Sequence, residues 1–209
     1  MYTGIRLSNL ALGEPLLNSY YEYNGKKGKD AVIERLHDQF FKIYNLGIEY
    51  VIDTITIKNT NSILSLYQGI NGDIWTLDER LQLYQQYAQQ YKVNIVLEID
   101  FSDVTNTNVN DYCNTILYNI ILQYSWVKYW IIGIQPDELI DNKYKCPPEL
   151  YTYILQKIYP KVKALNSNIF IGGPNIHQSI MQYVTNRTGW LSIACGDLYA
   201  SIKLILLLI

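Results

Sequence analysis

Two carboxylates spaced for acid–base chemistry lie near the end of an apolar, β-branched run, residues 93–101. Glu98 and Asp100 are two residues apart. Side chains alternate along a strand, so both share a face with Asn94 and Val96. Repulsion and burial move the pKa values of two such carboxyl groups apart, which suits one to donate a proton and the other to accept one. The alternative is that they pair with a polar residue of a neighbouring strand or lie on a solvated strand end.

Other apolar runs also end in side chains that form hydrogen bonds. These residues are Asn9, Asp53, Gln135, Asn175 and His177. In barrels of alternating strands and helices, chemistry collects where strands end and loops begin. We therefore expect these side chains to line a substrate site. A metal site is disfavoured, because neither His177 nor His37 has a ligand partner at helical spacing. His37 lies in a predicted helix and is expected to be a surface or half-buried residue.

The segments that must position these residues show two alternating periodicities. Short runs of strand type alternate with longer segments whose apolar residues recur with helical period. The predicted strands are residues 4–9, 48–56, 93–101, 129–135, 169–172 and one within 192–209. The predicted helices are residues 30–46, 77–92, 109–123, 149–165 and, more weakly, 179–186.

The ends of these helices carry sequence signals. Asp30 is predicted as the N-cap of the first helix, and Gly47 is expected to end it. Thr76 with Glu79 three residues later has the spacing of a capping box. Pro148 suits the first turn of a later helix.

Repeated strand–helix units predict an α/β protein. Five strands begin near residues 4, 48, 93, 129 and 169, an interval that fits one strand, one helix and two loops. An open doubly wound sheet and a closed barrel both satisfy this pattern. No Gly-rich phosphate loop follows any strand, which lowers the nucleotide-binding options and predicts no cofactor. The periodicity favours one domain over residues 1–209, an incomplete TIM-type (β/α)8 barrel of about six units.

The composition is that of a globular protein with a lightly charged surface. The 209 residues are 49% hydrophobic and 17% charged, with a net charge of −2. No basic field is available to attract phosphates, so nucleic acid is not an expected partner. No apolar run reaches the length that spans a bilayer, so no membrane association is expected. The N-terminus lacks the pattern of a secretory signal, which makes the cytoplasm the default location.

Cysteine and aromatic residues add weaker indications. Cys113, Cys146 and Cys195 match neither a metal site nor a disulfide framework, and a reducing compartment is the default. The 20 tyrosines against 4 phenylalanines fit either coding bias in an AT-rich genome or a sugar-binding surface, since Tyr combines an apolar face with a hydroxyl. Trp75 and Trp130 are candidate stacking platforms, although Trp130 alternates away from Gln135 and can instead belong to the core.

One segment carries a family resemblance. Residues 126–137, WVKYWIIGIQPD, closely resemble the fourth-strand signature of the large clan of retaining glycosidases built on (β/α)8 barrels, where an apolar strand runs into Gly-Asn-Glu-Pro and the Glu is the acid/base. Residues 168–174, NIFIGGP, are similar to the fifth strand of family 39 members such as β-xylosidase and α-L-iduronidase. Residues 196–201 are similar to the sixth, more weakly. The pattern covers most of the chain and is specific between about 126 and 175.

The departure from this signature bears directly on activity. Aligned on Gly133 and Pro136, the clan's Asn falls at Ile134 and its acid/base Glu at Gln135. Gln has no proton to donate near neutral pH and cannot become a carboxylate, and losing one such catalyst typically costs about 10²–10⁴-fold in rate. Ile134 also lacks the amide that would bind a sugar 2-hydroxyl. The resemblance therefore implies an impaired or inactive relative that binds oligosaccharide or polysaccharide.

Two other functions remain open. One is an active glycoside hydrolase with relocated carboxylates, for which Glu98, Asp100 and Glu138 are the candidates. The other is a structural or assembly protein, for instance in a viral or phage particle. The clan's nucleophile lies on a seventh strand that has no counterpart before residue 209, so we expect a truncated or frameshifted chain. Open sheet edges in such a chain favour self-association.

Overall fold

The computed structural model describes residues 4–6, 22–56, 67–68, 74–75, 77–100, 104–134, 136, 139–140 and 143–173. Its main sheet has the order β1-β4-β7-β8-β11. β1 pairs with β4, β7 with β8 and β8 with β11, and each of these pairings is parallel. The strands are β1 (Gly4–Arg6), β4 (Tyr50–Thr56), β7 (Asn94–Asp100), β8 (Tyr129–Ile132) and β11 (Phe170–Gly172). The predicted α/β class, with parallel strands of TIM-barrel type, is confirmed. The predicted helix at 179–186 and the predicted strand within 192–209 lie outside the described residues.

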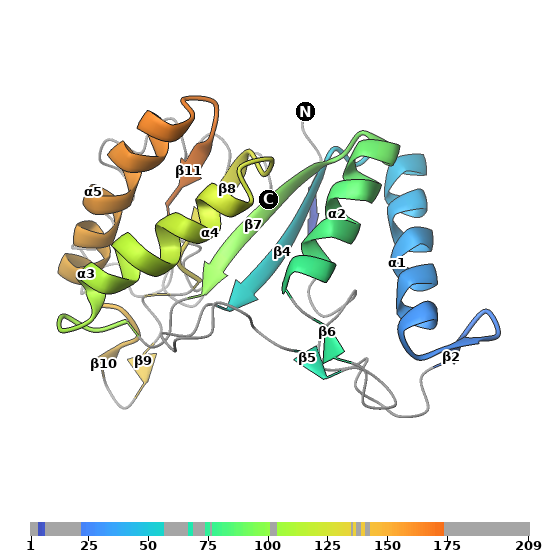
Figure 1. Cartoon of the computed structure of the whole chain (residues 1–209), viewed down its shortest axis with the longest axis horizontal. Helices are drawn as coiled ribbons and strands as arrows, with labels where there is room; N and C mark the ends of the chain where they lie inside the picture. The colour runs from blue at the N-terminus through green and yellow to red at the C-terminus, as the bar shows by residue number, and fades with distance from the viewer. Residues whose placement is uncertain are drawn as a thin grey trace, which may run out of the picture. The chain divides into compact units, whose positions relative to one another are not determined.

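Helices connect these parallel strands (Figure 1). They are α1 (Gly28–Asn45), α2 (Leu77–Tyr91), the continuous series α3 (Val109–Asp111), η3 (Tyr112–Leu117) and α4 (Tyr118–Gln123), and α5 (Pro148–Leu165). Three short antiparallel pairs, which the sequence did not predict, join β2 (Glu22–Tyr23) to β3 (Lys26–Lys27), β5 (Tyr67–Gln68) to β6 (Ile74–Trp75), and β9 (Leu139–Ile140) to β10 (Lys143–Tyr144). No helix in the described residues is long and apolar enough to cross a membrane.

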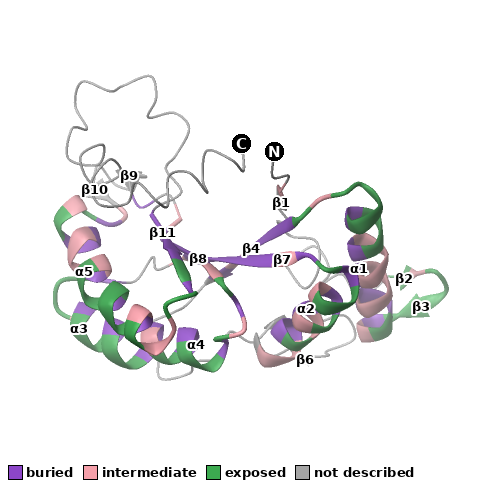
Figure 2. Ribbon diagram, turned by 90° about the horizontal axis from the view of Figure 1, so that it is seen from above, coloured by how far each residue is buried: buried purple, intermediate pink, exposed green. Residues whose placement is uncertain are grey.

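The chain divides into two compact units, residues 1–53 with 64–95, and residues 54–63 with 96–209. In the first unit α1 and α2 pack through aromatic rings. The ring of Phe40 lies 6.1 Å from that of Tyr84 and 5.6 Å from that of Tyr87. Leu36, one helical turn before Phe40, and Leu81, one turn before Tyr84, are fully buried. The helix faces that carry these residues are the buried ones in Figure 2.

In the second unit, the core includes the largest buried side chain of the described residues, Trp130. It is 1% exposed, and its indole Nε1 donates to the carbonyl of Val127 at 3.0 Å. Ile154 and Ile158 of α5 are fully buried. Trp130 is therefore a core residue, as the alternative interpretation held, and it offers no stacking platform to a sugar. The side chain of Trp75 lies outside the described residues.

The helix in the middle of the second unit contains a π-helical turn, η3. Its buried residues come in pairs every four positions: Tyr112 and Cys113, Ile116 and Leu117, Ile120 and Ile121. An α-helix repeats every 3.6 residues, so a repeat of four would wind around it. The wider π turn takes up the difference and keeps the pairs on one side.

Some predicted helix ends are confirmed and one is wrong. α1 begins at Gly28, and its N-cap is the extended Lys27. Asp30 lies in the first turn instead, where a carboxylate still interacts favourably with the helix dipole. Gly47 ends α1 as predicted, with φ +67°, and Pro148 opens α5. Thr76 lies outside the described residues.

Candidate functional site

The carboxylate of Glu98 lies on the face of β7 that meets a neighbouring polar side chain. Glu98 is 1% exposed, and the hydroxyl of Thr54 donates to its Oε2 at 3.3 Å. Both residues belong to the second unit. The contact matches the alternative in which Glu98 pairs with a polar residue of another strand. It also places a buried carboxyl near the carboxyl end of β7, where the fold class puts chemistry.

Asp100, at the end of β7, is bound by a lysine. The Nζ of Lys145 lies 2.7 Å from Asp100 Oδ1 and donates to the carbonyl of Ile134 at 3.3 Å. The Lys145 side chain is 11% exposed and that of Asp100 21%. An ammonium so far removed from water requires partners of this kind. Lys145 therefore joins the carboxyl end of β7 to the segment that follows β8.

The backbone after β8 explains the glycine of the family-like motif. Gly133 has φ +97°, a conformation that L side chains rarely adopt. Its N–H donates to the carbonyl of Ile99 at 3.0 Å. The hydroxyl of Tyr151, on α5, donates to the carbonyl of Ile132 at 2.6 Å. Ile134 is half-buried, and its described role is that of a backbone acceptor for Lys145.

Asp53 belongs to the first unit and faces α2. Its Oδ2 lies 2.5 Å from Arg80 Nη2 and accepts from the Tyr84 hydroxyl at 2.6 Å. Asp53 is 6% exposed and Arg80 4%. Burial, and secondarily the Asp53 charge, raises the pKa of Tyr84 well above its usual value, so this hydroxyl stays a donor. These contacts give Asp53 a structural role within its unit.

The remaining predicted site residues lie outside the described part of the chain. They are Asn9, Gln135, Glu138, Asn175 and His177. Their catalytic or binding roles stay predictions. Among the described residues no group of His, Cys, Asp or Glu could hold a metal ion.

Sequence reasoning missed two residues of this region, Thr54 and Lys145. Thr54 follows Asp53 in β4, so the alternation of side chains places Thr54 on the face opposite to that of Asp53. That alternation was a usable signal, because Asp53 and Thr54 cannot both face the same neighbours. Lys145 follows a short hairpin and precedes Pro147, in a segment without periodicity. Nothing in its surroundings in the sequence indicated that it would bind Asp100.

Two cysteines of the second unit have thiols of low reactivity. Cys113 and Cys146 are each 1% exposed. Burial raises the pKa of Cys113 to about 11 and that of Cys146 to about 12, against the smaller opposing effects of nearby lysines. The thiolate is the reactive form of cysteine, so neither residue is set up as a nucleophile.

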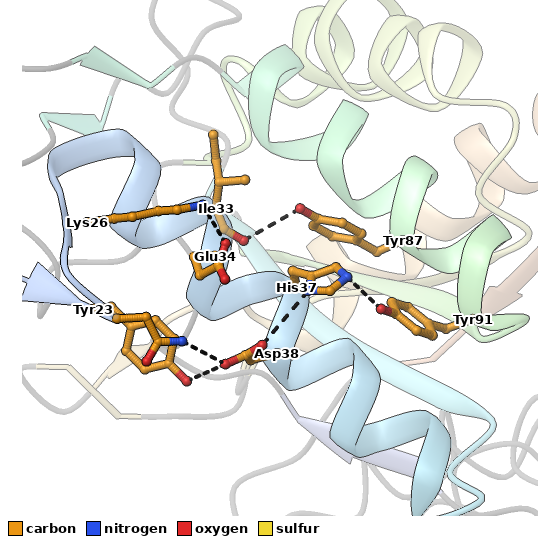
Figure 3. Close-up of polar contacts among 9 residues, drawn as sticks. Tyr23, Lys26, Ile33, Glu34, His37, Asp38, Tyr87 and Tyr91 are labelled. Atoms are coloured by element: carbon orange, nitrogen blue, oxygen red, sulfur yellow. Dashed lines mark hydrogen bonds and ion pairs between the residues drawn. The ribbon is translucent and has the colours of Figure 1, made fainter.

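A separate polar cluster lies on the surface of the first unit (Figure 3). The Tyr23 hydroxyl donates to Asp38 Oδ2 at 2.7 Å, and His37 Nε2 lies 2.7 Å from the Tyr91 hydroxyl. The His37 side chain is 40% exposed, which confirms the surface or half-buried prediction. The cluster holds the β2–β3 hairpin to α1 and α1 to α2, and its contacts are those of a surface network.

Comparison with solved structures identifies a shared fold. A family GH5 lichenase from Caldicellulosiruptor sp. F32 matches with a TM-score of 0.50 and 12% identity, over 83% of this chain and 52% of the lichenase chain. A β-1,4-D-mannanase from Cryptopygus antarcticus matches with a TM-score of 0.46 and 15% identity, over 82% and 55% of the two chains. A family 51 α-L-arabinofuranosidase from Bifidobacterium longum matches with a TM-score of 0.41 and 12% identity, over 82% and 37%.

These likenesses are structural. No family model matches the chain, and no curated protein sequence does so either. The chain spans about half the length of the mannanase and lichenase chains it matches. At this level of identity the likeness to the lichenase shows a shared β/α fold and does not extend to family 39.

Proposed function

We propose that this chain is a catalytically impaired, glycoside-hydrolase-like protein that binds an oligosaccharide or polysaccharide at the carboxyl ends of its strands. The observation that carries the proposal is the end of β7, where Glu98 and Asp100 occupy alternate positions in a fold shared with a lichenase. In barrels of this type, substrates bind at that end of the strands. The whole protein's activity is part of the proposal, since the match spans about half of the lichenase chain.

The chemistry of the described groups suits sugar hydroxyls. Carboxylates accept hydrogen bonds from hydroxyl groups, and the lysine ammonium donates to their oxygens. The Asp100–Lys145 pair therefore offers an acceptor and a donor side by side. A few polar groups placed this way fix the orientation of a small ligand.

The impairment rests on the sequence at position 135. Gln135 stands where the clan has its acid/base Glu, and an amide neither donates the proton to a leaving group nor activates water. We expect binding without efficient turnover, because ligand contacts survive the replacement and the proton transfers do not.

A panel of oligosaccharides tests this proposal by ligand-dependent thermal stabilisation. We expect the melting temperature to rise with ligand concentration for at least one glycan, with no turnover of aryl glycosides. Asp100→Asn should weaken that binding, because the Asp100 side chain is 21% exposed. Glu149→Gln removes the same charge from an exposed residue of α5 and should leave the binding intact. Indifference of the wild-type protein to the entire panel would refute the binding proposal.

A second candidate is an active hydrolase with relocated carboxylates. The observation that favours it is the burial of Glu98, because glycosidases hold their acid in a water-poor environment. Turnover of aryl glycosides by the wild-type protein, abolished by Glu98→Gln and retained in Glu149→Gln, would establish this candidate in place of the first. Glu138 remains a predicted partner for such chemistry.

A further inference from the structure

Lys145 makes two contacts that start from different strands. Its ammonium lies 2.7 Å from Oδ1 of Asp100, at the end of β7, and 3.3 Å from the carbonyl oxygen of Ile134, two residues beyond β8. The side chain comes from the short segment between β10 and α5. One cation, 11% exposed, thus joins three separate pieces of backbone in the second unit.

Backbone hydrogen bonds close the same region. The Gly133 N–H donates to the carbonyl of Ile99 at 3.0 Å, one residue before Asp100. The Cys146 N–H, next to Lys145, donates to the carbonyl of Pro136 at 2.8 Å. Ile134 and Pro136 therefore lie next to Lys145 and Cys146.

The burial of the pair decides how much this contact matters. Exposed ion pairs contribute little, because water screens them and two long side chains must be ordered. Lys145 is 11% exposed, so loss of either partner leaves a charge with few water molecules to replace it. The contact at Lys145 should therefore hold its neighbours more firmly than the exposed pair of Lys27 and Glu22, whose side chains are 72% and 52% exposed.

We propose that Lys145 is a positioning residue: it fixes the carboxyl end of β7 against the segment after β8, and so holds Asp100 in place on the binding face. The positioning half of this proposal rests on the contacts above. The ligand half rests on the proposed carbohydrate binding. The two halves have separate readouts.

Amide hydrogen exchange tests the positioning half without any ligand. In Lys145→Met, which keeps the length of the side chain without its charge, the amides of Gly133 and Cys146 should exchange about tenfold faster or more than in the wild type. Lys157→Met removes a lysine from the exposed face of α5 and should leave both amides unchanged. Lys145→Arg keeps the charge and should restore most of the protection.

The outcomes separate the two proposals. Unchanged exchange of Gly133 and Cys146 in Lys145→Met would overturn the positioning role, whether or not the protein binds glycans. Where a glycan ligand is found, Lys145→Met should weaken its binding about tenfold at unchanged fold content, with recovery in Lys145→Arg. Equal glycan affinity of Lys145→Met and the wild type would refute only the claim that Lys145 supports ligand binding. No glycan binding by the wild type would sink the proposed function and leave the exchange result standing.

Discussion

Two aspartates of parallel strands are each bound by a cation, but in different surroundings. Asp53 lies in a buried cluster with Arg80 and the Tyr84 hydroxyl. Asp100 keeps a fifth of its side-chain surface exposed beside Lys145. Sequence reasoning treated both as candidates for the same binding face. The difference in burial assigns Asp53 to the stability of its own unit and leaves Asp100 accessible to a ligand.

Removing Arg80 should reveal the cost of an unpaired buried carboxylate. We expect Arg80→Met to lower the free energy of unfolding by about 3–5 kcal/mol, because it leaves the buried Asp53 without its ion-pair partner. Glu34→Gln breaks the Lys26–Glu34 pair, whose side chains are 51% and 31% exposed, and should cost less than about 1 kcal/mol. Urea denaturation followed by circular dichroism measures both. Similar losses in the two variants would contradict the structural role of Asp53.

At the scale of elements, α1 and α2 end in the same way with different residues. Both stop at a residue in the left-handed conformation, Gly47 at φ +67° and Lys92 at φ +55°. In each case the next N–H donates to a helical carbonyl five residues earlier, Ile48 to Ile43 at 3.1 Å and Val93 to Ala88 at 3.1 Å. This is the Schellman arrangement, which favours glycine. The positive φ of Lys92 therefore costs conformational free energy that the same conformation does not cost at Gly47.

The matched pair gives opposite predictions for two substitutions. Lys92→Gly should stabilise the protein by about 1 kcal/mol, because glycine adopts positive φ without the steric cost of a Cβ. Gly47→Lys should destabilise it by about the same amount, and an added Cβ there meets no atom within 4 Å, so the effect isolates backbone conformation. Thermal or urea unfolding of the two variants checks the signs. A destabilised Lys92→Gly would show that the lysine side chain makes a contribution of its own.

The periodicity of the sequence predicted the main strands and helices, because burial on one face imposes the period of each element. Predicted and observed ends differ by one or two residues at α1 and β4. The short hairpins were missed, although Asn24-Gly25, with φ of 50° and 75°, has the chemistry of a tight turn. At the candidate site, Glu98 and Asp100 were predicted from their spacing, and their catalytic or binding roles stay predictions. Lys145 was not, since its contact depends on where an aperiodic segment returns.

At the scale of the molecule, buried thiols and phenols make the free energy of unfolding depend on pH in the alkaline range. Burial raises the pKa values of Cys113 and Cys146 to about 11 and about 12, and raises those of Tyr84, Tyr112 and Tyr151 well above 10. In the unfolded chain these groups ionise at their ordinary values, near 9 for the thiols and 10 for the phenols. Between those limits the unfolded state loses protons that the folded state keeps, so stability falls as pH rises.

The free energy of unfolding should therefore be nearly constant from about pH 7 to 8.5 and decline above about pH 9. The double variant Cys113→Ala and Cys146→Ala removes the thiol contribution, so its decline should begin nearer pH 10, where the phenols ionise. Urea titrations at several pH values measure both curves. Stability that rises between about pH 9 and 11 would contradict the burial of these groups.

The π turn of the helix at 109–123 bears on whether this helix tolerates the deletion of a residue. A π turn holds one residue more than an α turn, and Asn114 and Thr115 are exposed within it. Deleting either one would bring the buried pairs to an average repeat close to that of an ordinary helix. Single-residue deletions usually rotate the rest of a helix by about 100° and expose its core. Here the π turn already contains one additional residue, so we expect this helix to keep its buried face when one of these residues is deleted.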